Sequence, residues 1–487
     1  MKYLLLLVSG IVFVANEGFA QDEFDVLRYS QLDHYGDARF NAMGGSFGAL
    51  GANLSAISTN PGGLGVYKSS DFSFTPAFHY NYSESNKDGN SVTDGKLNFH
   101  FSNIGIAGNF KGSGDWKSIN LAMGYNRLSN YNTSIAIKST TDNSMLNTYT
   151  SELNANGGIY EEDISYEFPF SSNLAYQTYI VNPIDTGSLQ YNHVFQNSNN
   201  ITQATRYETR GGSGEMYFAL GSNYSDKLYL GASIGIPSVK YVFDRNYSET
   251  SDPSDTLTEF KSFSVHDYVK TTGAGLNLKL GMIYKVADWF RLGTAFHTPT
   301  VYSLSDQWST TVSSEDKAGE VLTEVSPSGN FEYFVTTPYR FVSSAAFVVG
   351  SRGVINGDYE IIDYSTARIT EDNAFGSADF SSENNRIRNN FRATHNIRVG
   401  TEWRLDPFRL RAGYRYQGDP LKNSFNVDNS SSTYSVGFGI KQEDYYFDMS
   451  YLQRFSKAES AVVAGQGEFA TVNLKDHYIS FTLGFRF

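Results

Sequence analysis

From Asp71 to the end of the chain, hydrophobic and polar residues alternate at every second position, and short polar turns separate the alternating segments. Between 228 and 236, leucine, isoleucine and alanine occupy one face, whereas Tyr229, two glycines and a serine occupy the other. The last segment alternates in the same way and ends on Phe487. Because the side chains of a strand point to opposite faces in turn, this period predicts β-strands with one apolar face.

The composition of the opposite face separates two kinds of all-β protein. In 409–416, Arg409, Arg411 and Arg415 share a face with Gly413, whereas a soluble β-sandwich usually has a mixture of Lys and Glu there. Apolar outward and small or charged inward is the pattern of a wall between lipid and water. The sequence therefore predicts an all-β fold, a transmembrane antiparallel β-barrel spanning 71–487.

The number of strands follows from counting these segments, with one ambiguity between 116 and 139. Bacterial barrels of this kind have an even number of strands, so we predict about fourteen. The segments lie near 71–83, 96–111, 116–128, 131–139, 213–224, 228–247, 258–286, 288–311, 330–350, 353–364, 391–404, 407–417, 431–441, 444–455 and 474–487. The links 140–212, 312–329 and 365–390 are long and polar, and we expect the first to form a large extracellular loop.

Composition agrees with a barrel in an outer membrane. Phe, Tyr and Trp make up 15% of the residues, which suits both strands and the aromatic girdles of a membrane barrel. The mean hydropathy of -0.37 is low because every second position faces away from lipid. No apolar run is long enough for a membrane helix, which needs about 20 residues.

The first 70 residues precede the alternating pattern and divide into two parts. Lys2, an apolar run and the small residues before Gln21 form a secretory signal peptide, residues 1–20. Residues 21–70 are rich in glycine and do not alternate. Glycines permit tight turns and close packing against another surface. We therefore predict that 21–70 is a hatch that fills the lumen.

Charge and cysteine content exclude several function classes. The net charge of -13 leaves no basic excess to neutralise phosphates, so we expect no nucleic acid partner. There are no cysteines, which rules out disulfides and thiolate chemistry. The eight histidines form no metal-binding motif, so we expect no metal site and no cofactor.

Short motifs in this frame resemble the FadL-type outer-membrane transporters, the long-chain fatty-acid and aromatic-hydrocarbon channels, in the form common in Bacteroidetes. Asn60, Pro61, Gly62, Gly63 and Leu64 are similar to the hatch motif Asn-Pro-Ala of that family, with Gly62 in place of the alanine. The segments 291–299 and 337–341 are similar to its strand ends with Thr-Pro. The resemblance implies a plugged barrel of fourteen strands, a hydrophobic ligand and a lateral exit through the wall.

One strand has a feature that would suit such an exit. Leu97, Phe99 and Phe101 have one parity, and Ile104 and Ile106 have the other. The switch predicts a bulge at Ser102, Asn103 and Gly105. These three residues are our candidate lateral gate, and an ordinary barrel bulge is the alternative.

Arginines are the candidate polar ligands of the lumen. Arg398, Arg409, Arg411 and Arg415 are predicted to point inward from neighbouring strands. Together they could bind a ligand carboxylate. The alternative is a network of salt bridges within the lumen, with Glu402 among the partners.

The leading function is passive uptake of hydrophobic small molecules, such as long-chain fatty acids. A structural or adhesive barrel and an outer-membrane lipid hydrolase are the alternatives, the latter with His477 near Ser480 or His395 near Thr394. A hatch is unnecessary for either alternative, so we expect no enzyme activity and no catalytic residues. Expected partners are outer-membrane lipid, lipopolysaccharide and the barrel assembly machinery, which a terminal aromatic strand would engage, and we expect a monomer.

Overall fold

The computed structural model describes residues 22–371, 379–422, 428–462 and 469–487. The predicted signal peptide, residues 1–20, lies outside the described residues. In the described part of the chain, no helix is both long enough and apolar enough to span a bilayer.

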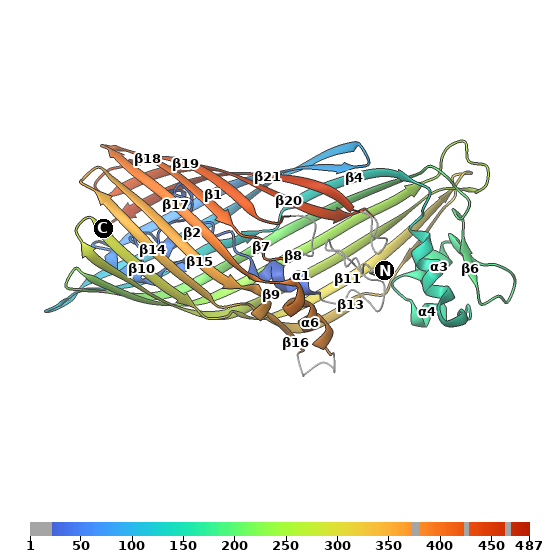
Figure 1. The fold of residues 1–487 in the computed structure, drawn as a ribbon, viewed down its shortest axis with the longest axis horizontal. Helices are drawn as coiled ribbons and strands as arrows, with labels where there is room; N and C mark the ends of the chain where they lie inside the picture. Colours follow the sequence, from blue (N-terminus) through green and yellow to red (C-terminus); the bar gives the residue numbers. More distant parts are fainter. Residues whose placement is uncertain (1–21, 372–378, 423–427, 463–468) are drawn as a thin grey trace, which may run out of the picture.

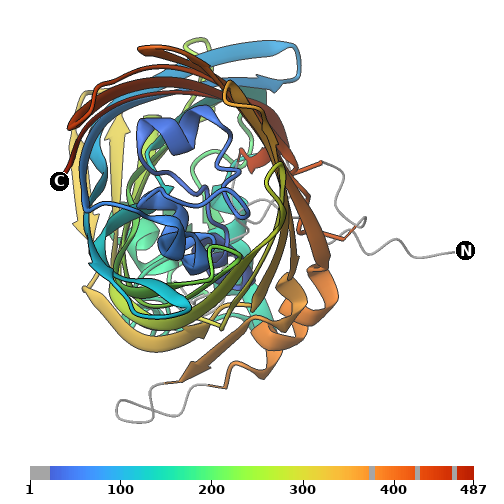
Figure 2. The same cartoon turned by 90° about the vertical axis from the view of Figure 1, so that its left-hand side faces the viewer.

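The chain forms a closed antiparallel β-barrel of 14 strands, as predicted, with the N-terminal segment inside it (Figures 1 and 2). Successive wall strands pair as neighbours, and the last closes the barrel against the first from Asp71 to Asn86. The strands are β1 (Asp71–Lys87), β2 (Asn90–Lys111), β3 (Trp116–Asn130), β4 (Thr133–Thr141), β7 (Ile201–Tyr224), β8 (Leu228–Thr250), β9 (Phe260–Ala287), β10 (Phe290–His297), β11 (Val301–Asp316), β12 (Val321–Val325), β13 (Gly329–Thr336), β14 (Arg340–Val349), β15 (Gly353–Asp363), β16 (Arg368–Glu371), β17 (Ala393–Leu405), β18 (Phe408–Gln417), β19 (Ser431–Lys441), β20 (Tyr445–Ala461) and β21 (Phe469–Arg486).

Some wall strands consist of two segments, which resolves the ambiguous count. Both β3 and β4 pair with β7, so the predicted segments 116–128 and 131–139 belong to one wall strand. Likewise, β10 and β11 both pair with β9 on either side of Pro299. Proline has no backbone N–H to donate, so the ladder is interrupted there.

The wall changes character along its length, and β8 shows how. From Leu228 to Pro237 the exposed outward side chains, such as Ile234, are apolar. From Ser238 onward the exposed side chains include Lys240 and Asn246, whereas Tyr241 and Phe243 point inward and are buried. Crossing the bilayer needs only about 9–11 residues of strand. We infer that the first half of β8 faces lipid and that the second half projects beyond the membrane.

This projection explains where the predicted links are wrong. The strand β7 begins at Ile201, within the predicted loop 140–212. The end of β11 and all of β12 lie in 312–329, and β16 and helix α6 (Ser381–Asn390) lie in 365–390. Strands outside the membrane have polar outward faces, so their sequences resemble loops.

A cap of residues 142–200 covers one end of the barrel, at the right of Figure 1. Glu249 of β8 anchors it by accepting a hydrogen bond of 2.6 Å from the backbone N–H of Met145. The elements of the cap are α3 (Leu146–Asn154), η3 (Ala155–Gly157), α4 (Ile164–Glu167), α5 (Ser172–Gln177), β5 (Val181–Pro183) and β6 (Tyr191–His193).

The hatch lies inside the barrel, where Figure 2 shows it enclosed by the strands. It begins with α1 (Glu23–Ser30), whose first turn is closed by a capping box at Asp22. Next comes α2 (Ala38–Ala42), where the Asp37 carboxylate accepts from the N–H of Phe40 at 2.8 Å. The turns η1 (Ser55–Ser58) and η2 (Pro61–Val66) complete it before β1.

Candidate functional site

The hatch motif Asn60 to Leu64 is buried against the wall strands β7, β8 and β9. The Asn60 side chain accepts from the N–H of Gly62 at 2.9 Å and donates to the carbonyl of Met282 at 3.2 Å. A Cβ added at Gly62 would lie 2.8 Å from the backbone nitrogen of Met282. The wall backbone is therefore too close for an alanine at this position, which accounts for the glycine.

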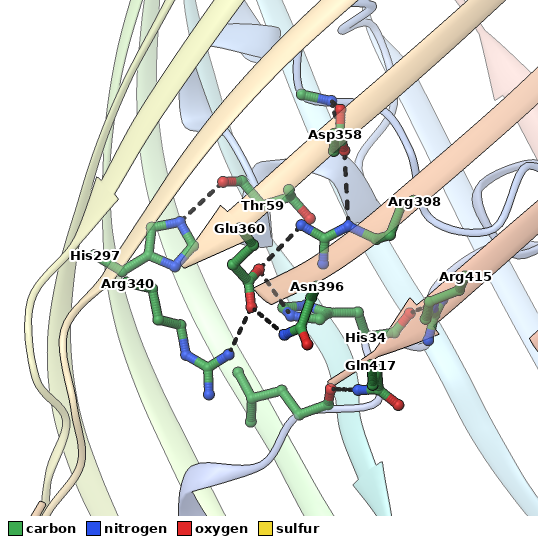
Figure 3. A network of polar contacts seen from close by, with 12 residues as sticks. His34, Thr59, His297, Arg340, Asp358, Glu360, Asn396, Arg398, Arg415 and Gln417 are labelled. Atoms are coloured by element: carbon green, nitrogen blue, oxygen red, sulfur yellow. Dashed lines mark hydrogen bonds and ion pairs between the residues drawn. The ribbon is translucent and has the colours of Figure 1, made fainter. Parts of the chain in front are cut away.

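Buried carboxylates and arginines of the wall form a second set of contacts with the hatch (Figure 3). Glu360 of β15 accepts from Arg340 at 3.1 Å and from Arg398 at 3.0 Å. Asp358 on the same strand accepts from the hatch N–H groups of Phe47 and Gly48, each at 3.1 Å. Asp358 and Glu360 thus balance the buried cations and hold the hatch backbone at the same time.

The four candidate arginines, Arg398, Arg409, Arg411 and Arg415, mostly bind groups of the protein itself. Arg415 donates to the hatch carbonyls of Asp33, His34 and Gly44. Arg411 pairs with Glu402 and Asp448, each at 2.6 Å, and Arg409 pairs with Asp406 at 2.9 Å. The four candidate arginines point inward as predicted. Their contacts fit the salt-bridge network that was the alternative to a carboxylate site. The structure does not bring the four guanidinium groups together around one ligand-sized space.

Beyond the hatch, the inner wall is apolar and aromatic. One buried cluster extends over the projecting halves of the strands and includes the hatch helix α1 through Val26, Leu27 and Tyr29. Wall members of the cluster include Tyr241, Phe243, Phe263, Tyr302, Leu304 and Tyr333. The interior of a water-filled barrel is polar instead. A hydrophobic molecule would therefore find apolar contacts here.

The predicted bulge is present where the parity switches. The register between β1 and β2 shifts so that Pro76 faces Phe101 and Thr75 faces Asn103. Ser102 and Asn103 are therefore both buried, and Ser102 donates to the hatch carbonyl of Gly36 at 2.7 Å. The bulge is thus confirmed, and its use as a gate stays a prediction.

The same level of the wall contains a seam that sequence reasoning missed. Backbone pairing of β2 with β3 ends at Asn103 and Asn126, so residues 90–102 pair with β1 alone among the described strands. Beyond Asn126, the register of β3 shifts around Leu128, whose carbonyl accepts from the hatch N–H groups of Asp33 and His34. We define the seam as the unpaired interval between 90–102 of β2 and 127–141 of β3 and β4.

Along the seam the two edges overlap. Tyr207 of β7 is buried in the lumen, so its neighbours Arg206 and Glu208 are on the outer face. Arg206 binds Asp94 at 2.9 Å and Glu208 binds Lys96 at 2.6 Å, although both partners are on the inner face of β2. The β1–β2 hairpin therefore lies over the outside of β4 and β7, and it leaves the outline of the barrel at the top of Figure 2. Polar side chains join the seam where the backbone ladder is missing.

The candidate hydrolase residues are not brought together. Ser480 is fully buried in the lumen and contacts Ser450 at 2.7 Å, whereas His477 lies on the opposite face and contacts Tyr451 at 2.8 Å. His395 contacts Tyr359 on the outer face, and its neighbour Thr394 points inward. Within the described residues there is also no group of three or more His, Cys, Asp or Glu that could hold a metal ion.

Comparisons with known proteins agree with this architecture. Residues 219–477 match a family described as outer membrane protein transport protein (OMPP1/FadL/TodX). A FadL homologue of Pseudomonas aeruginosa superimposes with a TM-score of 0.55 at 12% identity, covering 93% of this chain and 98% of the other. The toluene transporter TodX of Pseudomonas putida gives 0.53 at 13%, covering 94% and 99%. The toluene transporter TbuX of Ralstonia pickettii gives 0.52 at 13%, covering 93% and 99%. No curated protein matches the sequence.

Proposed function

The chain belongs to the OMPP1/FadL/TodX family of outer-membrane transport proteins, and on that premise we propose that it takes up long-chain fatty acids or related lipophilic molecules by passive transport. It is a channel for hydrophobic compounds in the outer membrane. The cargo and its route are our proposal.

The apolar interior beyond the hatch is the observation that carries this proposal. An alkyl chain with roughly 400 Å² of apolar surface would lose about 10 kcal/mol on entering a water-filled lumen, at about 25 cal/mol per Å². Contacts with side chains such as Phe243 and Tyr302 avoid that loss. The aromatic lining therefore favours a cargo that avoids water throughout its passage.

The seam supports a lateral exit. The hatch blocks the axis of the barrel and is held by wall contacts such as those of Asp358 and Arg415. At the level of Ser102 and Leu128, the wall lacks backbone pairing between β2 and β3. The seam begins beside Leu97, Phe99 and Phe101, which expose apolar side chains outward. A cargo that leaves beside them would enter the bilayer without crossing the hatch.

An aromatic hydrocarbon is the second candidate cargo. Two of the similar solved structures are toluene transporters, and an aromatic lining would accept a small aromatic molecule as well as an alkyl chain. An adhesive barrel has no use for a lumen that is apolar and closed by a hatch.

Uptake measurements distinguish these cargoes. Cells with and without this protein would be given labelled oleic acid, an alkyl-aromatic hydrocarbon and haem. We expect protein-dependent uptake of oleic acid and little of haem. Equal uptake of all three by both kinds of cell would refute transport, and uptake of the hydrocarbon alone would identify the second cargo.

Bulky substitutions test the exit. Ser102→Trp, Asn103→Trp or Gly105→Trp should reduce uptake while the barrel stays folded, because each adds bulk at or next to the end of the β2–β3 pairing, where the seam begins. Ser303→Trp, at an exposed outward position of β11, is the matched control. Unchanged uptake in the first three variants would remove the gate from this strand.

A further inference from the structure

Two polar side chains beside the seam have hydrogen-bonding capacity that the barrel itself does not fully use. His100 lies on the inner face of β2, two residues before the bulge, and is 8% exposed. Arg127 lies on β3, directly beyond the last backbone pair that joins β2 to β3. Both residues therefore border the place where a cargo would pass from lumen to bilayer.

We propose that His100 and Arg127 form a binding site for a carboxylate in the seam, between the inner face of β2 and the outer face of β3. The proposal rests on the lateral exit proposed above and makes its cargo more specific. The cargo would be an amphipathic carboxylic acid with a long apolar tail, rather than a neutral hydrocarbon.

The first argument is that the hydrogen-bonding groups of His100 are buried without partners. Neither of its ring nitrogens has a hydrogen-bond partner among the described residues. Its ring packs against Tyr478, with the centroids 5.5 Å apart, so the side chain is held in position. Buried polar groups in proteins nearly always have a partner, and an unpaired one requires an explanation. A ligand oxygen at this place would supply the missing bond.

The second argument is the charge of Arg127. Its guanidinium donates to the backbone carbonyls of Ser129 at 3.0 Å and Gly211 at 2.7 Å, which leaves further N–H groups for a ligand. Among the described residues it has no carboxylate partner. Arg127 is close enough for its charge to act on His100. A guanidinium and an imidazole N–H together suit a carboxylate.

The nearby acids do not neutralise this pair. Asp476 binds His79 at 3.0 Å and Asn81 at 2.9 Å. Asp33 of the hatch binds Arg454 at 2.6 Å. Both carboxylates are therefore already bound by other residues, and the charge of Arg127 remains available for a negatively charged ligand.

The outer side of the seam suits the tail of the same molecule. Leu97, Phe99 and Phe101 point outward from β2 on either side of His100, and each is about half exposed or more, at 66%, 52% and 49%. An apolar tail could lie along these side chains towards lipid while its head is held at His100. A neutral hydrocarbon would gain the tail contacts alone.

Binding of an acid and of its ester tests the proposal. The purified protein in detergent would be titrated with cis-parinaric acid, a fluorescent long-chain carboxylic acid, and with its methyl ester. His100→Phe keeps a ring in place but removes both nitrogens, and Arg127→Gln removes the charge. We expect each variant to weaken binding of the acid by about tenfold or more, with the ester changed by less than about twofold.

Matched variants and a second ligand make the result decisive. His395→Phe and Arg210→Gln change the same residue types on the outer face and should leave both affinities unchanged. Equal weakening of acid and ester, or no change in either, would overturn the carboxylate site. His100→Phe alone gives the answer if Arg127→Gln fails to fold. If the unmodified protein bound neither probe, the proposed function itself would fail; if it bound both while the variants matched it, this inference alone would fail.

Discussion

Replacing Gly62 by alanine tests how closely the hatch fits the wall. The added Cβ would lie 2.8 Å from the backbone nitrogen of Met282 and 2.9 Å from its Cα and from the carbonyl carbon of Gly281. These are backbone atoms of β9, which is paired on both sides and cannot rotate away. The hatch turn must therefore move away from the wall, towards the barrel axis, and the hydrogen bond from Asn60 to Met282 must lengthen.

The magnitude follows from the cost of overpacking, which is typically about 1–3 kcal/mol per added group. If this cost applies to the docked hatch and not to the released one, release becomes between about fivefold and about 150-fold more frequent. The position has an ordinary backbone conformation, so the clash alone produces the effect. Gly357→Ala on β15 is the matched control, because the nearest atom to its Cβ would be 3.9 Å away.

Hydrogen exchange of the hatch amides measures this release. The amides of Ala52 and Gly63 are both bonded within the hatch at 3.0 Å and should be protected in the native protein. In Gly62→Ala they should exchange faster by the factor given above, and in Gly357→Ala they should exchange at the native rate. Equal exchange rates in both variants would show that the hatch does not rest on β9 as described.

Three further predictions concern the network, the cap and the seam. Arg398→Met removes the cation between Asp358 and Glu360 and should lower stability to unfolding by about 3–5 kcal/mol; a loss below about 1 kcal/mol in denaturant titrations would contradict its role. Burial lowers the pKa of His193 in the cap to about 4, so the unfolded cap binds more protons and cap stability should fall as the pH drops from about 6.5 towards 4. Protease cleavage of residues 142–200 should rise over that range, and His193→Asn should remove the rise. Lys96→Ala with Arg206→Ala removes two ion pairs across the overlap, each worth at most about 1 kcal/mol, and should speed uptake of oleic acid; slower uptake would contradict a seam that opens.

The alternating pattern predicted the barrel, its lipid-facing residues and the bulge at Ser102, because each depends on local side-chain parity. The pattern also predicted inward arginines such as Arg398 and Arg411. Of their partners, Glu402 was predicted and pairs with Arg411. Asp358 and Asp448 were not predicted, since they come from other strands and their register is set by the whole wall.

Features that depend on missing contacts were not predictable in the same way. The sequence of β3 between Arg127 and Asn130 has no unusual composition, and the seam exists because β2 and β3 cease to pair there. The helix α6, which lies in a segment predicted to be a link, was missed because it depends on contacts with a distant part of the chain. The side-chain amide of Asn384 binds both backbone groups of Ile369 at the edge of β16, at 3.1 and 2.8 Å. No short motif indicates either arrangement.

The most direct test of the lateral route is to find where a cargo lies during passage. A long-chain carboxylic acid with a photoreactive diazirine in its tail would be added to cells, irradiated and located on the protein by mass spectrometry. The account predicts labels on both edges of the seam, at residues 97–103 of β2 and 127–130 of β3. Labels at Lys441 and Arg486, on the inner face of the opposite end of the barrel, with none at the seam, would contradict it.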